Sequence, residues 1–82
     1  MTVRVAAGGC IELIGACPSE DAETLLQLLL ADPGATVDWR ECRDAHTAVV
    51  QVLMAVRPKL LGPAADSRLQ DWVAPAITYA PP

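Results

Sequence analysis

The chain has 82 residues, enough for one small domain with a modest core. Its net charge of −4 argues against binding to nucleic acid or to an anionic membrane, because both repel a negative protein. No apolar run approaches the ~20 residues of a membrane span, and MTVRVAAGGC lacks the continuous apolar core of a signal peptide. We therefore expect a single soluble, cytoplasmic domain over residues 1–82.

Three cysteines, Cys10, Cys17 and Cys42, form neither a CxxC motif nor an even framework. We expect Cys10 and Cys17 to lie on one strand, which would separate them by ~23 Å. A disulfide needs Cα atoms within ~7 Å. We therefore expect reduced, mostly buried thiols.

The first part of the chain predicts an antiparallel hairpin. Residues 2–6 alternate weakly between apolar and polar side chains, as a half-buried strand does. Gly8-Gly9 is typical of a two-residue turn, because both glycines accept positive φ. The chain should return as a strand over residues 10–14 and leave the sheet over residues 15–18.

A helix should follow, with Ser19 as its N-cap. Glu20 and Asp21 are favourably placed against the positive end of the helix. Asp32-Pro33-Gly34 should end it, since proline disfavours a helical residue before it. The apolar positions recur at helical spacing: Ala22, Leu25, Leu26, Leu29 and Leu30.

The segment Thr36–Pro58 predicts a buried strand, a polar loop and a second helix. The strand Thr36–Trp39 should lie parallel to the strand over 10–14 after a right-handed crossover. The loop Arg43–Thr47 falls where the carboxyl end of that strand meets the next helix. Open α/β sheets usually meet their ligands and partners at such junctions. The helix should start at about Thr47 and stop before Pro58.

Lys59–Leu61 predicts a third parallel strand. Asp66 or Ser67 should cap a last helix that packs Trp72 onto the sheet and ends at Pro75. The tail should add an edge strand around Ile77–Tyr79 or fray. The order ββαβαβα predicts a small α/β domain with a mixed sheet and helices packed on it.

Individual residues leave several interpretations open. Thr47 is an N-cap, a phosphoacceptor or a partner contact. His46 is a loop residue near a helix start, or a base that lacks a well-placed nucleophile. One histidine without chelating spacing gives no metal site, and no cofactor is expected.

Other polar and apolar residues are open in the same way. Glu20, Asp21 and Glu23 form a solvated first turn or a partner surface. Asp38 points to solvent or binds loop amides. Three apolar residues are candidates for an exposed patch suited to protein association: Leu28, Trp39 and Leu60.

Four strings, taken in order, resemble a STAS domain, the fold of bacterial anti-sigma factor antagonists. Ile11-Glu12-Leu13-Ile14-Gly15 followed by Asp21-Ala22-Glu23-Thr24-Leu25 is similar to the family's strand, L-x-G and first-helix pattern. Val37-Asp38-Trp39-Arg40-Glu41-Cys42 is similar to its V-D-L-S-x-V strand. His46-Thr47-Ala48-Val49-Val50 falls where the family has Asp-Ser-x-Gly-Leu. The resemblance covers roughly residues 3–78.

The resemblance implies a regulatory protein of signal transduction and transcription. In that family a partner kinase phosphorylates the Ser or Thr at this helix start, and the phosphate changes partner choice. Thr47 holds that position here. A similar module is the small cytoplasmic subunit of the bacterial lipid-asymmetry transporter.

We therefore expect a non-enzymatic module that binds a protein partner, such as an anti-sigma kinase. The expected contact residues are Glu20, Asp21, Asp38, Arg43, Asp44, His46, Thr47 and Val50. The alternatives are an accessory subunit of a bacterial lipid-transport ABC complex, bound to its ATPase, and a small enzyme that uses Cys42 or His46. Homodimer formation is left open.

Overall fold

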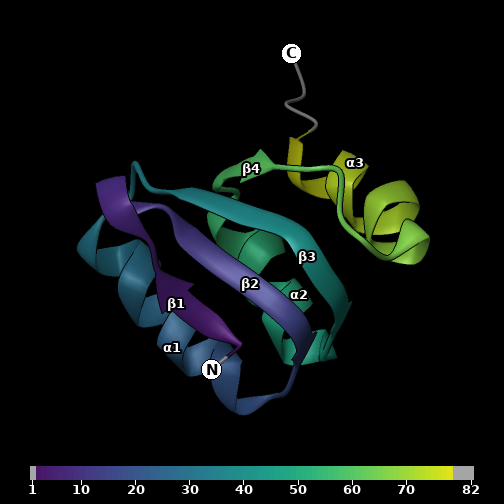
Figure 1. The fold of residues 1–82 in the computed structure, drawn as a ribbon, viewed down its shortest axis with the longest axis horizontal. Helices are drawn as coiled ribbons and strands as arrows, with labels where there is room; N and C mark the ends of the chain where they lie inside the picture. Colours follow the sequence, from purple (N-terminus) through teal and green to yellow (C-terminus); the bar gives the residue numbers. More distant parts are fainter. Residues whose placement is uncertain (1, 79–82) are drawn as a thin grey trace.

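The computed structural model describes residues 2–78 and consists of a four-stranded sheet with helices (Figure 1). The elements in chain order are β1 (Val3–Val5), the 3₁₀ turn η1 (Ala7–Gly9), β2 (Ile11–Cys17), α1 (Glu20–Ala31), β3 (Thr36–Ala45), α2 (Thr47–Val56), β4 (Lys59–Leu61), the π-helical turn η2 (Leu69–Val73) and α3 (Ala74–Thr78). This order confirms the predicted ββαβαβα arrangement and the α/β class.

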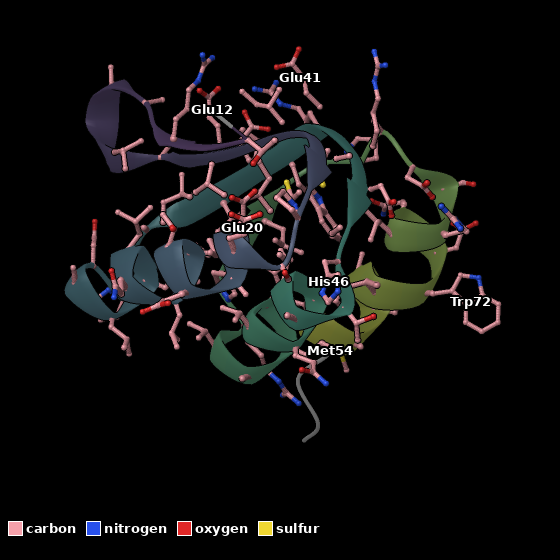
Figure 2. All side chains as sticks on the ribbon, turned by 90° about the horizontal axis from the view of Figure 1, so that it is seen from below. Glu12, Glu20, Glu41, His46, Met54 and Trp72 are labelled. Atoms are coloured by element: carbon pink, nitrogen blue, oxygen red, sulfur yellow. The ribbon has the colours of Figure 1, made fainter. Side chains whose placement is uncertain are left out.

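The strands lie in chain order across the sheet. β1 pairs antiparallel with β2, which confirms the hairpin, although η1 replaces the predicted two-residue turn. β2, β3 and β4 are mutually parallel. Two right-handed crossovers place α1 and α2 side by side behind one face of the sheet (Figure 1). Within residues 2–78 no helix covers the opposite face, and Glu12 and Glu41 project from it (Figure 2). We call it the open face.

The core lies between the sheet and the two helices. Strand residues contribute Ile11, Leu13, Val37 and Trp39, and the helices contribute Leu25, Leu29, Val49 and Leu53. Each of these side chains is at most 2 % exposed. Leu25 with Leu29, and Val49 with Leu53, are four residues apart, so each pair lies on one helix face.

β2 and β3 are longer than predicted, because two irregularities hide their alternation. β2 continues to Cys17 instead of leaving the sheet at Gly15, and β3 continues to Ala45 through the segment expected to be a loop. The pairing register shifts between Glu12 and Ile14, and again after Gly15. Each shift inserts one extra residue into β3, which resembles a β-bulge and resets which side chain faces the core.

Trp39 is buried, which corrects its prediction as part of an exposed patch. It is 1 % exposed and is the largest side chain of the core. Gly62 closes over the indole: a Cβ at Gly62 would lie 2.6 Å from Trp39 Nε1. Leu28 and Leu60 are half-buried against the core, so they do not form the predicted patch either.

The carboxyl-terminal helical segment differs from its prediction. Asp66 caps it, since Asp66 Oδ1 accepts the Arg68 N–H at 2.7 Å. Pro75 does not end it: the Ala74 N–H donates to the Leu69 carbonyl, and this wider π turn precedes α3. Trp72 is 80 % exposed and points away from the molecule (Figure 2).

The segment instead packs through residues at a spacing of four: Leu69, Val73 and Ile77. The predicted edge strand is therefore wrong for residues 77 and 78, which lie in α3, while Tyr79 lies outside the described residues. Within residues 2–78 no helix is both long enough and apolar enough to span a bilayer.

Candidate functional site

The starts of α1 and α2 lie together at the carboxyl ends of β2 and β3. Cys17 pairs with Ala45 at the ends of these two strands. The His46 N–H then donates to the Cys17 carbonyl at 2.9 Å. Figure 2 shows Glu20 and His46 at the two helix starts, on the side of the sheet opposite to Glu12. We call residues 19–23 and 44–48 the rim.

His46, not Thr47, caps α2, which corrects the predicted N-cap. His46 Nδ1 accepts the Ala48 N–H at 3.1 Å, and the His46 carbonyl accepts the Val49 N–H at 2.8 Å. The hydrogen bond to Nδ1 gives the Ala48 N–H in the first helical turn an acceptor, as an N-cap does. Thr47 is the first residue of the helix and is exposed, and its hydroxyl forms no hydrogen bond within residues 2–78.

The cap gives a testable expectation for His46. His46→Ala should destabilise the fold by about 1 kcal/mol, because one helix N–H loses its acceptor. His46→Asp should retain the stability, since aspartate is a strong N-cap. Urea unfolding followed by circular dichroism measures both variants. Equal losses for alanine and aspartate would show that the cap does not stabilise α2.

The first turn of α1 carries a cluster of acidic side chains. They are Glu20, Asp21 and Glu23. Asp21 accepts a hydrogen bond from the Thr2 hydroxyl, and Glu23 accepts one from Gln27 at 3.4 Å. No ion pair within residues 2–78 involves any of the three. Ser19 occupies the N-cap position of α1, as predicted, but it has helical dihedral angles and its side chain forms no capping hydrogen bond.

Asp38 lies away from the rim, where β3 pairs with β4. Its carboxylate accepts the Arg40 backbone N–H at 3.1 Å and two guanidinium hydrogen bonds, at 3.1 and 2.8 Å. Asp38 is only 8 % exposed, and its hydrogen bonds with Arg40 hold the pKa of its carboxyl below the ordinary value. It therefore stabilises the strand and does not join the predicted contact surface.

Asp38→Asn should lower the free energy of unfolding by about 1 kcal/mol at pH 7. Because the folded-state pKa is depressed, this stabilisation exists above the ordinary aspartate pKa and is lost as the pH falls through the folded value. The gap between wild type and variant should therefore close toward pH 3 and below. Urea unfolding across this range measures it, with the exposed Asp71→Asn as the control. A gap that stays constant with pH would contradict the assignment.

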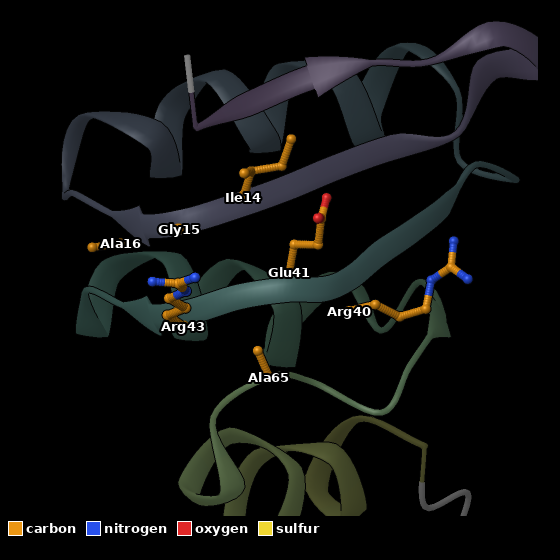
Figure 3. Close-up of a pocket in the computed structure, with 7 residues that line it drawn as sticks. All are labelled: Ile14, Gly15, Ala16, Arg40, Glu41, Arg43 and Ala65. Atoms are coloured by element: carbon orange, nitrogen blue, oxygen red, sulfur yellow. The ribbon is translucent and has the colours of Figure 1, made fainter.

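Arg43 lies over the open face rather than on the rim. With Arg40 and Glu41 it borders a shallow hollow of about 500 Å³ above Ile14 and Ala65 (Figure 3). Arg43 forms no ion pair within the described residues. Val50 is half-buried in α2 and packs against the core. The structure thus brings Glu20, Asp21, Asp44, His46 and Thr47 together and leaves Asp38, Arg43 and Val50 outside the group.

The thiol of Cys42 is poorly suited to nucleophilic chemistry. Cys17 and Cys42 are buried and free of disulfides, as predicted. The Cys42 thiol donates to the Asp44 carbonyl at 3.4 Å. Its interaction with the Cys17 thiol, together with burial, raises the pKa of the Cys42 thiol. A thiol held in its neutral form is a weak nucleophile. Residues 2–78 also hold no cluster of three or more side chains fit to bind a metal ion.

A second feature lies beside the rim and was not predicted from the sequence. Ala48, Val52 and Ala55 of α2 line an apolar groove against α1. Their small side chains look like ordinary helix formers, so only their spacing of four and three residues on one face could have revealed it. No family model, curated protein or solved structure matches this chain.

Proposed function

We propose that this chain is a non-enzymatic, STAS-like regulatory module that binds a protein partner through the rim. The observation that carries the proposal is the exposed Thr47 hydroxyl in the first turn of α2, beside the acidic first turn of α1. The ordered resemblance to anti-sigma factor antagonists supports it. Two further observations support it. The pKa of the Cys42 thiol is raised, and His46 Nδ1 accepts the Ala48 N–H, so neither side chain is well suited to act in catalysis.

The charge of the rim determines the kind of partner. Glu20, Asp21 and Glu23 place three carboxylates at one helix start, and Asp44 adds a fourth nearby. Within residues 2–78 none of them is neutralised by an ion pair. The partner therefore presents lysine or arginine side chains here, because complementary charge speeds encounter and excludes acidic partners.

Thr47 is the residue through which the partner is regulated. A phosphate on its hydroxyl would add a charge of about −1.5 to −2 and strong acceptor oxygens at a helix start, which favours anions. That charge would strengthen the attraction for an arginine of the partner. Phosphorylation then acts as a switch that raises affinity for the basic partner.

Affinity capture tests the proposal. The immobilised chain is exposed to lysate of the source organism, and bound proteins are identified by mass spectrometry against empty resin. We expect a reproducible protein partner whose retention falls with added salt. Capture of a kinase-like regulator would support the hypothesis of an anti-sigma factor antagonist. Capture of a transporter ATPase would support the alternative hypothesis of an accessory subunit. No partner at low salt, with either unmodified or phosphorylated Thr47, would contradict the proposal.

A further inference from the structure

A groove runs between the outward faces of α1 and α2. Each helix follows a strand of the parallel set, so their amino ends lie side by side and the groove opens at the rim. Its volume is about 370 Å³. The apolar lining comes from both helices: Ala22, Leu26, Ala48, Val52 and Ala55.

The lining favours a helix over other occupants. Apart from Glu23 and Gln51 it is apolar, so an extended peptide would leave backbone polar groups without partners along most of its length. A helix satisfies its own backbone and offers apolar side chains at spacings of three and four. Three alanines in the lining allow close approach, and Leu26 is 36 % exposed, so a ligand can bury it.

The charges around the groove favour a basic partner over a second copy of this chain. Glu20, Asp21 and Glu23 stand at the rim end, and Glu23 itself lines the groove. Neither α1 nor α2 contains a lysine or arginine, and Arg57 follows α2 at the other end. A second copy would therefore add mainly acidic and apolar surface to a chain whose net charge is already −4.

We propose that the groove receives an amphipathic helix of a partner protein, with its apolar face against α1 and α2 and its basic end over the rim. This inference rests on the proposed function and names the part of the partner that docks. Ala48 lines the groove and follows Thr47 directly, so the docked helix ends beside the regulatory hydroxyl.

A designed peptide tests the groove directly. The probe is an amphipathic helix of about 18 residues with leucines at spacings of three and four and lysines at its carboxyl end, where they also stabilise its own helix. A matched peptide carries glutamates in place of the lysines. Both are titrated into the ¹⁵N-labelled full chain. We expect saturable amide shifts at Leu26, Ala48, Val52 and Ala55 with the lysine peptide, and at least about tenfold weaker binding of the glutamate peptide.

Two variants complete the test. Ala55→Gln fills the groove at an exposed position and should weaken binding at least about tenfold, because a buried interface rejects an added polar side chain. Ala65→Gln, an exposed alanine beside the hollow on the open face, should leave binding unchanged. Far-ultraviolet circular dichroism confirms that both variants fold.

Several results would overturn the inference. They are the absence of saturable shifts up to about 1 mM peptide, shifts centred on the open face, equal binding of both peptides, or a dimer of this chain that Ala55→Gln dissociates. The captured partner separates this inference from the proposed function. If Ala55→Gln retains the captured partner fully and Thr47→Arg loses it, the groove is not a docking site but the rim still binds the partner. If both variants retain the partner fully, neither the groove nor the rim binds it.

Discussion

Replacing Trp39 by alanine should lower the free energy of unfolding by about 3–5 kcal/mol. Trp39 is 1 % exposed and fills the core between β3 and the turn at Gly62. Its removal leaves a cavity that the surrounding backbone can close only partly. A domain of this length is stable by about 4–12 kcal/mol, so the variant should be partly unfolded in mild urea.

Trp72→Ala provides a matched control, because it removes the same side chain from a position that is 80 % exposed. It should change stability by less than about 0.5 kcal/mol. Urea unfolding followed by far-ultraviolet circular dichroism measures both variants without relying on tryptophan fluorescence. Similar losses for the two variants would contradict the burial of Trp39 in the core.

Thr47→Arg should weaken binding of the captured partner at least about tenfold, since it places a cation against the basic residues of the partner. Thr47→Ser should retain binding, and Thr47→Glu should retain or strengthen it. Thr47 is exposed and does not supply the helix cap, so none of the three changes should destabilise the fold by more than about 0.5 kcal/mol.

Ser67→Arg is the control for a charge change at another exposed hydroxyl near a helix start, outside residues 19–23 and 44–48. It should leave the affinity unchanged. Isothermal titration calorimetry with the purified partner measures the series. If Thr47→Arg binds as tightly as wild type, or if Ser67→Arg weakens binding equally, Thr47 does not lie at the partner interface.

The order of elements followed from the sequence because each element carries a local signal. The spacing of Leu25 and Leu29, the glycines before Ile11 and the proline after Arg57 each act within a few residues. The ends of β2 and β3 could not be predicted in the same way, because the register shifts depend on pairing between two distant strands. In the sequence these register shifts are visible only as a change in the spacing of core residues, from two between Val37 and Trp39 to three between Trp39 and Cys42.

The position of the rim could be predicted from the sequence, but the roles of individual side chains could not. The sequence placed Glu20 and Thr47 at helix starts and Asp44 in the loop before the second helix, and a parallel sheet brings such starts to one end. The capping role of His46 depends on a side-chain rotamer and on strand β3 reaching Ala45. The burial of Trp39 and exposure of Trp72 depend on the turn at Gly62 and on a π-helical turn, which no local spacing indicates.

Chemical-shift mapping tests most directly which surface of the chain binds the partner. The ¹⁵N-labelled chain is titrated with the purified captured partner, and amide shifts are followed residue by residue. Shifts concentrated in residues 19–26 and 44–55, at the rim and along the groove, are the expected result. Shifts concentrated in residues 12–16 and 38–43, on the open face, would contradict it.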